Sequence, residues 1–396
     1  MLRVIHRTLL LALAAGLGLW PTGAGAHDAS AWGGLFRTRD GGASWFQASA
    51  GRVMGGALAV TIDPTAPDDL VLGTDSGLLR SRNGGRDWDL LASDVLLGAA
   101  LAVSFDTSGQ TLLAANASTL AASSDGVHWQ SRLLPIGAAP PRALVPAGPA
   151  GAFYLLGWNG LFSSDDAGTT WSPLGSGLPG PVSRLLIEPT ASGSLVALVD
   201  GGIWSSRDGG RTWTPRDRGG LPAGGVEALD RDPGMPARLW AGGADRVFRS
   251  DDDGQTWSAV GQPLPDAGTR LHGIAASLDQ DGSRLLLSTD RGLYVTTDGG
   301  AHWDLLVDNL PGHIEAGPLV FATRQPATLY AGFSVTPYDE VWQNAASGSS
   351  ALARLARSEL VGALAFVLLL GLGAGLALRL LARRSQPPRV QRRLAG

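Results

Sequence analysis

The sequence contains no cysteine and no lysine. The absence of cysteine excludes disulfides, zinc–thiolate sites, attachment of c-type haem and thiol catalysis. The absence of lysine excludes a lysine nucleophile or Schiff base. Charge is also scarce, since 17% of the 396 residues are charged, the formal net charge is −4, and no basic run occurs in the middle of the chain. We therefore expect no nucleic-acid partner.

Histidine and glutamate are rare as well. The six histidines never occur at H-x-H or H-x-x-x-H spacing, so they do not form a recognisable ligand pair. The acidic run Asp251–Asp253 lacks the later glutamate of an EF-hand loop. The sequence predicts neither a metal site nor a cofactor.

Glycine and tryptophan, in contrast, are abundant and recur together. Residues 206–213 read Ser-Arg-Asp-Gly-Gly-Arg-Thr-Trp, with the pattern Ser/Thr-x-Asp-x-Gly-x-x-Trp, and seven close copies occur at steps of 43, 41, 42, 42, 44 and 46 residues. Repeats of 40–45 residues are typical of propeller blades built from four short strands. The key motif residues are Asp40 and Trp45, Asn83 and Trp88, Asp125 and Trp129, Asp166 and Trp171, Asp208 and Trp213, Asp252 and Trp257, and Asp298 and Trp303.

Each motif residue has a structural explanation. The aspartate can accept hydrogen bonds from backbone N–H groups of its own turn. The glycine supplies a positive φ, and the tryptophan opens the next strand and can bury its ring against the neighbouring blade. Because the same residues recur wherever the same turn recurs, we interpret them as structural and not as catalytic.

Short β-type runs lie between the motifs. In residues 226–260 they are Val226–Leu229, Arg238–Gly242, Arg246–Ser250 and Trp257–Val260, separated by Gly, Pro and Asp. Short strands at this spacing with such turn residues indicate an all-β repeat.

The two ends of the array complement one another. The first motif is preceded by only one strand, Leu35–Thr38, and followed by Trp45–Ala48, whereas the seventh motif is followed by two unpaired strands, Gly317–Phe321 and Thr328–Gly332. Pairing these strands would close a ring and remove exposed edges. The sequence therefore predicts an all-β, seven-bladed β-propeller with split-blade closure.

The N-terminus has the three-part pattern of a secretory signal peptide. Arg3 and Arg7 precede an apolar run at 9–20, and Ala24-Gly25-Ala26 predicts cleavage before His27. An uncleaved N-terminal anchor is the alternative.

The C-terminus has the pattern of a membrane anchor. Residues 360–378 carry no charge and would span roughly 28 Å as a helix at about 1.5 Å per residue. An arginine cluster follows at once and predicts the cytoplasmic side. The predicted organisation is a signal peptide at 1–26, a propeller at 27–340, a flexible tether at 341–359, a transmembrane helix at 360–381 and an Arg-rich cytoplasmic tail at 382–396. The predicted localisation is a single-pass membrane protein with its propeller outside the cytoplasm, on the periplasmic side if the source is bacterial.

The octapeptide and its copies resemble the Asp-box, or BNR, repeat over about residues 32–334. This repeat occurs in sialidases, xyloglucan-type glycoside hydrolases, the sortilin luminal domain and photosystem II assembly factors. The predicted blade count and the third-strand pattern are most similar to the assembly-factor and sortilin side, although the C-terminal anchor departs from soluble assembly factors. The resemblance implies a propeller whose ligand binds on the face opposite the motif turns.

Several charged residues map to that face. The predicted binding residues are Arg142, Arg184, Arg270, His272, Asp200 and Asp290. Three of them are arginines that could imitate the carboxylate clamp of a sialidase, but three of the four tyrosines fall in predicted strands, where a nucleophile is not expected. Of the five glutamates, Glu227 and Glu315 are the catalytic candidates.

Two functional hypotheses remain. The first is a membrane-anchored extracytoplasmic propeller that binds a protein or glycan partner or assists complex assembly, with an envelope or membrane protein as its partner. The alternative is a glycoside hydrolase, sialidase-like or glucanase-like, that uses carboxylates on the loop face. Enzymatic activity is thus left open, and the first hypothesis is preferred because no catalytic set stands out.

Overall fold

The computed structural model describes residues 33–52, 54–92, 94–189, 191–276, 284–322 and 325–347. The predicted signal peptide and transmembrane helix lie outside these residues. Within the described ranges, no helix is long and apolar enough to cross a membrane. The chain divides into two compact units, Met1–Trp342 and Gln343–Gly396, and the first contains every strand.

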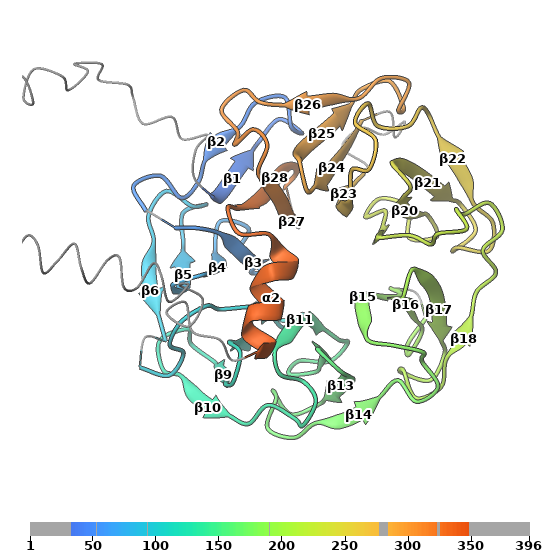
Figure 1. The fold of residues 1–396 in the computed structure, drawn as a ribbon. Coiled ribbons are helices and arrows are strands. Elements are labelled where there is room, and N and C mark those ends of the chain that lie inside the picture. The colour runs from blue at the N-terminus through green and yellow to red at the C-terminus, as the bar shows by residue number, and fades with distance from the viewer. Residues whose placement is uncertain are drawn as a thin grey trace, which may run out of the picture. The chain divides into compact units, whose positions relative to one another are not determined.

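Seven four-stranded antiparallel sheets form a ring of blades, as the sequence predicts (Figure 1). In each blade the first strand lies nearest the axis of the ring and the fourth lies at the rim. The strands of blades 2 to 4 are β3 (Ala57–Ile62), β4 (Leu70–Thr74), β5 (Gly77–Ser81), β6 (Asp89–Leu91), β7 (Ala102–Phe105), β8 (Leu112–Ala115), β9 (Leu120–Ser123), β10 (Gln130–Arg132), β11 (Pro141–Pro146), β12 (Phe153–Gly157), β13 (Leu161–Ser164) and β14 (Ser172–Leu174).

Blades 5 to 7 repeat the same order. Their strands are β15 (Val182–Ile187), β16 (Leu195–Val199), β17 (Gly202–Ser206), β18 (Thr214–Pro215), β19 (Ala228–Arg231), β20 (Leu239–Gly243), β21 (Arg246–Ser250), β22 (Ser258–Val260), β23 (Leu271–Ala275), β24 (Leu285–Thr289), β25 (Gly292–Thr296) and β26 (Asp304–Leu306).

Blade 1 is the split blade. It combines β27 (Glu315–Ala322) and β28 (Gln325–Ser334) with β1 (Gly34–Thr38) and β2 (Phe46–Gln47), in the order β2-β1-β28-β27. β1 pairs with β28 along its whole length, and the fully buried rings of Phe36 and Phe333 meet edge to face at 5.2 Å. The predicted closure is confirmed.

The motif turns have the predicted chemistry. Asp208 Oδ1 accepts hydrogen bonds from the backbone N–H groups of Arg211 (3.0 Å) and Thr212 (2.9 Å), and the Ser206 hydroxyl accepts one from Gly210 N at 2.9 Å. Five motif tryptophans are buried, whereas Trp129 and Trp171 are half-buried. Hydrophobic clusters fill the spaces between neighbouring sheets, so each blade is stabilised mainly by its neighbours.

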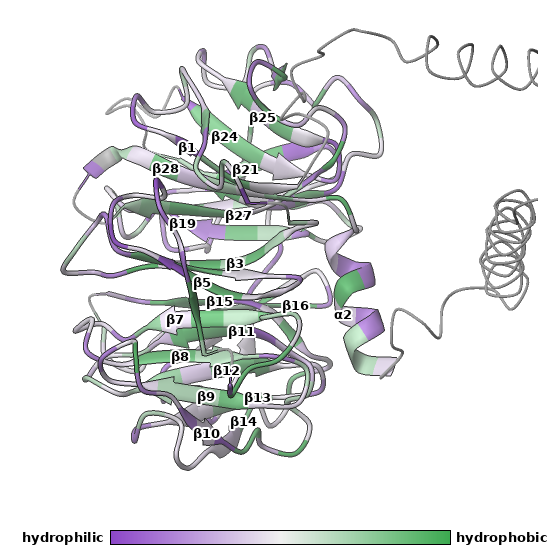
Figure 2. Cartoon of the chain, turned by 90° about the vertical axis from the view of Figure 1, so that its left-hand side faces the viewer, coloured by the Kyte–Doolittle hydropathy of each residue, from purple (hydrophilic) through white to green (hydrophobic). Residues whose placement is uncertain are grey.

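The two ends of the propeller differ in their connections. The motif turns and the loops from first to second strands form one end, here called the motif face. The second-to-third hairpins and the connections from each fourth strand to the next first strand form the other end, here called the loop face. The helix α2 (Tyr338–Ser347) begins on the loop face, and the side view shows it against that end of the strands (Figure 2).

α2 differs from the flexible tether expected from residue 341, because the helix continues to Ser347. Its start is fixed by Tyr338, whose backbone N–H donates to Glu315 Oε2 at 2.7 Å and whose hydroxyl donates to Ala57 O at 2.7 Å. The ring of Tyr338 lies against Gly317, where a Cβ would come within 2.1 Å of it. A glycine is therefore required at 317 for the helix to dock. The remainder of the predicted tether lies outside the described residues.

Candidate functional site

A cavity of about 290 Å³ opens on the loop face at the axis of the ring. Six of the seven first strands contribute to its wall, and Tyr338, Asp339 and Trp342 of α2 contribute the rest. We call this cavity the axial pocket. First strands line it because they are the innermost strands of their blades (Figure 1).

β-bulges aim side chains into the axial pocket. Five first strands have a register irregularity near their start, and the extra residues there are Leu58, Arg142, Ser183, His272 and the pair Gly317-Pro318. All of them line the pocket. A bulge places one more residue on a strand than its partner can pair, which re-aims the side chain. Sequence patterns gave no sign of these bulges.

Arg142 is the cation of the pocket that has no acidic partner. Among the described residues, no carboxylate forms an ion pair with its guanidinium, and its buried Nε has no hydrogen-bond acceptor. The group stacks on the Trp158 ring with Cζ 4.6 Å from the centroid. Burial lowers the pKa of Arg142, while the charge of Asp339 opposes this effect. A half-buried, unpaired cation favours an anionic ligand.

The other charged groups of the pocket wall are engaged in contacts between blades. Arg184 pairs with Asp230 and also donates from Nε to Leu229 O at 3.2 Å. Asp230 Oδ2 accepts Ile274 N at 3.2 Å, and Glu227 Oε2 accepts Leu271 N at 3.0 Å. These carboxylates of blade 6 therefore bind backbone N–H groups along the first strand of blade 7.

His272 and Glu315 form a contact beneath α2. His272 Nε2 lies 2.8 Å from Glu315 Oε1, and the side chain of Glu315 is only 4% exposed. The second oxygen of Glu315 holds the N-terminus of α2 through Tyr338 N. Both candidate catalytic glutamates, Glu227 and Glu315, thus accept hydrogen bonds from backbone N–H groups.

The remaining predicted binding residues lie outside the axial pocket. Arg270 donates from its backbone N–H to Asp290 Oδ1 at 3.0 Å, and its Nη1 forms an ion pair with Asp339 Oδ2 at 3.1 Å. Asp200 lies in the β16–β17 hairpin and does not line the pocket. The structure therefore brings Arg142, Arg184 and His272 together, places Arg270 and Asp290 as a pair beside α2, and leaves Asp200 apart.

Residues of α2 were not anticipated as part of the site. Trp342 Nε1 donates to Pro141 O at 3.0 Å, and the ring of Tyr338 lies 6.0 Å from that of Trp342. A helix start was nevertheless readable, since Pro337 precedes two acidic residues, Asp339 and Glu340, in the first turn. Aromatic side chains four residues apart share one face of a helix.

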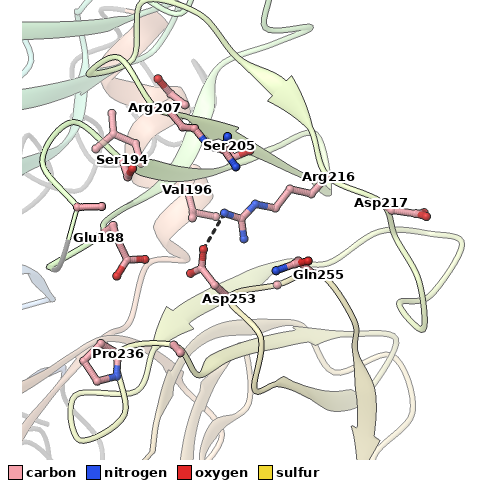
Figure 3. Close-up of a pocket in the computed structure, with 15 residues that line it drawn as sticks. Glu188, Ser194, Val196, Ser205, Arg207, Arg216, Asp217, Pro236, Asp253 and Gln255 are labelled. Carbon is pink, nitrogen blue, oxygen red and sulfur yellow. Dashed lines mark hydrogen bonds and ion pairs between the residues drawn. The ribbon is translucent and has the colours of Figure 1, made fainter.

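A larger hollow of about 980 Å³ lies on the motif face between blades 5 and 6 (Figure 3). Beside this hollow, Val196 of the second strand of blade 5 pairs with Ser205 of the third strand. The matching pair in blade 4 is Tyr154 and Ser163, and the Tyr154 hydroxyl reaches Gly209 O in the next blade at 3.5 Å. The junction of blades 4 and 5 also holds a hollow, of about 720 Å³, so the smaller Val196–Ser205 pair accompanies the larger of the two hollows.

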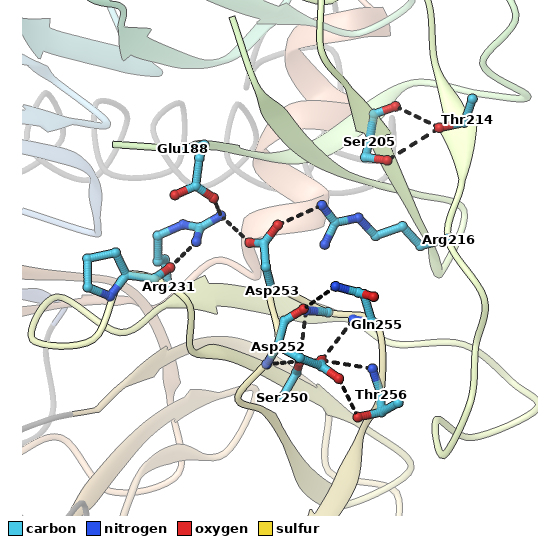
Figure 4. Close-up of polar contacts among 12 residues, drawn as sticks. Glu188, Ser205, Thr214, Arg216, Arg231, Ser250, Asp252, Asp253, Gln255 and Thr256 are labelled. Atoms are coloured by element: carbon cyan, nitrogen blue, oxygen red, sulfur yellow. Dashed lines mark hydrogen bonds and ion pairs between the residues drawn. The ribbon is translucent and has the colours of Figure 1, made fainter. Parts of the chain in front are cut away.

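A chain of ion pairs crosses the same junction (Figure 4). Asp253 accepts from Arg216 Nη2 and Arg231 Nη2, both at 3.0 Å, and Arg231 also lies 3.0 Å from Glu188. Asp253 has φ 56°, at the motif position where Gly209 occurs in blade 5. Asp253 and Glu188 therefore neutralise the charges of Arg216 and Arg231, although Arg216 Nη1 and Arg231 Nε are buried without a hydrogen-bond partner. In the described part of the chain, no group of three His, Asp or Glu side chains is arranged to hold a metal ion.

No family model matches the chain, and no curated protein matches it in sequence. Solved structures do match it. A structure titled "YCF48 bound to D1 peptide" has a TM-score of 0.55 at 18% identity over 72% of this chain and 95% of that one. YCF48 from Cyanidioschyzon merolae has a TM-score of 0.54 at 15% identity over 71% and 96%. A GH74 xyloglucanase from Xanthomonas campestris has a TM-score of 0.50 at 20% identity, covering 74% of this chain but 55% of that one.

The fold is a seven-bladed β-propeller. At these identities the likeness to YCF48 and to the xyloglucanase concerns the fold, which binding proteins and hydrolases share.

Proposed function

We propose that this chain is a membrane-anchored, extracytoplasmic Asp-box propeller that binds a protein partner in the axial pocket and assists its assembly. The observation that carries the proposal is Arg142, a half-buried cation without an acidic partner among the described residues, aimed into the pocket by a β-bulge. The YCF48 structure with a D1 peptide supports a protein partner, because it shows that a propeller of this fold can bind a peptide.

The chemistry of the pocket selects a carboxylate on the partner. Glu227, Asp230 and Glu315 already accept hydrogen bonds from the propeller's own N–H groups, so they leave Arg142 as the group that needs a counter-charge. A carboxylate can take two parallel hydrogen bonds from a guanidinium. The volume of about 290 Å³ suits one acidic side chain or a short peptide segment and excludes a folded domain.

The location of the propeller follows from the sequence. The signal peptide at 1–26 and the transmembrane helix at 360–381 would place residues 27–359 outside the cytoplasm and keep the pocket near a membrane. The preferred partner is accordingly an envelope or membrane protein with an exposed acidic segment.

The test is cross-linking of the full chain in its native membranes, comparing Arg142→Gln with Arg82→Gln. Arg82 is an exposed arginine in a motif turn on the opposite face and serves as the matched control. A hydrogen-bonded charge is worth about 1.5–3 kcal/mol, so Arg142→Gln should weaken capture of the partner by roughly 10- to 100-fold. Equal capture by both variants would contradict the axial pocket as the binding site.

A glycoside hydrolase remains the second candidate, because the fold is shared with a GH74 xyloglucanase. Purified chain would be assayed with chromogenic sialosides and glucans, together with Glu227→Gln and Glu315→Gln. Hydrolysis that is lost in either variant would favour the enzyme. We expect no turnover, because both carboxylates accept hydrogen bonds from backbone N–H groups.

A further inference from the structure

One sector of the loop face differs from the rest in carrying no charge. Four connections of blades 3 and 4 form it, namely residues 116–119, 133–140, 158–160 and 175–181. Every other loop-face connection between two strands contains at least one charged residue, and Asp94 and Asp200 occur in the neighbouring ones. We call these four connections the uncharged sector.

Apolar side chains project from this sector into solvent. Ile136 is 100% exposed and Leu133 is 90% exposed, the two largest values among the large hydrophobic side chains of the described residues. A cavity of about 250 Å³ lies between residues 158–160 and 175–181, and its wall contains no charged side chain. Isolated exposed apolar residues are common, but a cluster of them in an uncharged area marks an interaction surface.

The chain leaves the propeller beside this sector. Trp342 is bonded to Pro141 O, and Pro141 directly follows the connection that carries Leu133 and Ile136. Seventeen residues lie between Trp342 and Leu360, the start of the predicted membrane span, which allows at most about 60 Å of extended chain. The anchor would therefore keep the bilayer within about 60 Å of Trp342 and within reach of the uncharged sector.

We propose that the uncharged sector docks on the lipid bilayer, with Leu133 and Ile136 inserted at the interface. This inference rests on the membrane anchor of the proposed function. A lipid surface fits better than a soluble partner because the anchor keeps bilayer within reach at all times. The neighbouring Trp158 agrees with this choice, since it has the amphipathic ring favoured at membrane interfaces.

Because the sequence contains no cysteine, a fluorophore can be attached to a single introduced cysteine. Ile136→Cys and, as a matched control, Val127→Cys would each carry an environment-sensitive fluorophore on the full chain in liposomes. Val127 is 65% exposed and belongs to the same blade, but lies in a motif turn on the opposite face. We expect the label at 136 to be quenched by lipids spin-labelled near the headgroup and shielded from iodide. The label at 127 should behave in the opposite way.

The second variant introduces a negative charge into the uncharged sector. Leu133→Asp in the Ile136→Cys background should remove the lipid quenching, because a carboxylate is unfavourable below the headgroups. Since Leu133 is almost fully exposed, this change leaves the propeller core untouched.

Carbonate extraction and iodide quenching together distinguish a failure of the docking from a failure of the anchor. If carbonate extraction leaves the chain in the vesicles while iodide quenches positions 136 and 127 equally, the docking is wrong and the anchor stands. If carbonate releases the chain, the anchor is wrong, and the docking is overturned as well unless added vesicles shift the label at 136 on the released chain. Shielding at 136 in native membranes but not in pure lipid would assign the sector to a protein partner and overturn the lipid proposal.

Discussion

The aspartates of the motif turns bind backbone N–H groups as carboxylates, and this has a consequence for acid stability. Hydrogen bonds from the Thr170 N–H and hydroxyl lower the pKa of Asp166 to about 2. The pKa of Asp40 is also about 2, because its contacts with Ser44 and Thr38 outweigh the effect of burial. A carboxyl whose pKa is lowered on folding stabilises the fold above its unfolded pKa.

We therefore predict that the free energy of unfolding decreases as the pH falls from about 4 to about 2. Asp166→Asn should make this decrease smaller, because an amide oxygen can still accept the turn's N–H groups, as Asn83 does from Arg86 N and Asp87 N. Urea unfolding at pH 7, 4, 3 and 2 measures the effect. Asp89→Asn, at an exposed carboxylate outside the motif turns, is the control, and an equal change in both variants would contradict the prediction.

The motif tryptophans are expected to be the largest single contributors to blade packing. Trp213 is 8% exposed, and its Nε1 donates to Gly210 O at 2.9 Å. Trp213→Ala should lower the free energy of unfolding by about 3–5 kcal/mol, the range for a buried aromatic side chain. Phe46→Ala, at a residue that is 61% exposed, should change it by less than about 0.5 kcal/mol. A loss below about 1 kcal/mol at Trp213 would show that its ring is not a packing element.

Individual residues of the site were only partly predictable. Arg142, Arg184 and His272 could be placed on the loop face because loop positions follow from the repeat. Their convergence depends on β-bulges, which change the direction of a side chain without a sequence signal of their own. Asp200, chosen on the same grounds, lies in a hairpin that does not face the axis.

At the scale of elements, the junction between blades 5 and 6 is held partly by ion pairs of Asp253 with Arg216 and Arg231. Asp253 has a left-handed backbone conformation, as Ala167 has at the same position of the motif turn in blade 4. The turn therefore sets this conformation, and the carboxylate of Asp253 adds the contacts with the two arginines.

Asp253→Gly tests the ion pairs of Asp253 against the backbone strain at this position. Glycine removes about 1 kcal/mol of backbone strain, but it leaves Arg216 without its carboxylate, and breaking a buried ion pair costs about 3–5 kcal/mol. Because the side chain of Asp253 is 34% exposed and glycine relieves strain, we expect a smaller net loss of about 1–3 kcal/mol in urea unfolding. Adding Arg216→Met should recover part of it. A stabilised single variant would mean that the ion pairs contribute nothing.

The docked helix α2 could not be predicted from the local composition. Its second half lies in an Ala- and Ser-rich stretch that is typical of a linker, so a flexible tether was the natural expectation. Its docking depends on contacts that are distant in sequence, since Tyr338 reaches Ala57 O across 281 residues. Local sequence carries no information about such contacts.

At the scale of the whole molecule, the fold was predictable because the period of the repeat fixes the size of a blade. The count of seven and the split blade both follow from where the motifs begin and end. The partner of the axial pocket does not follow from the repeat, because binding residues occur where the blades differ from one another.

The ring should require its last two strands. We predict that a chain ending at His313 does not reach the native state, because β1 loses β28 and the fully buried side chains of Leu35 and Phe36 become exposed. Gel filtration and near-UV circular dichroism measure this, and a chain ending at Ser347 is the control. A monomeric, cooperatively unfolding short form would contradict the prediction.

The pairing of Leu35 with Gly332 also determines when the ring can close during translation. These two residues are 297 positions apart, so at roughly 5–20 residues per second β1 is made about 15–60 s before its partner. Six blades can form within that interval while the first waits with an open edge. The ring is sealed once β28 is made, before the predicted anchor at 360–381 leaves the ribosome. A chaperone that protects β1 during this delay would have no further role once β28 arrives.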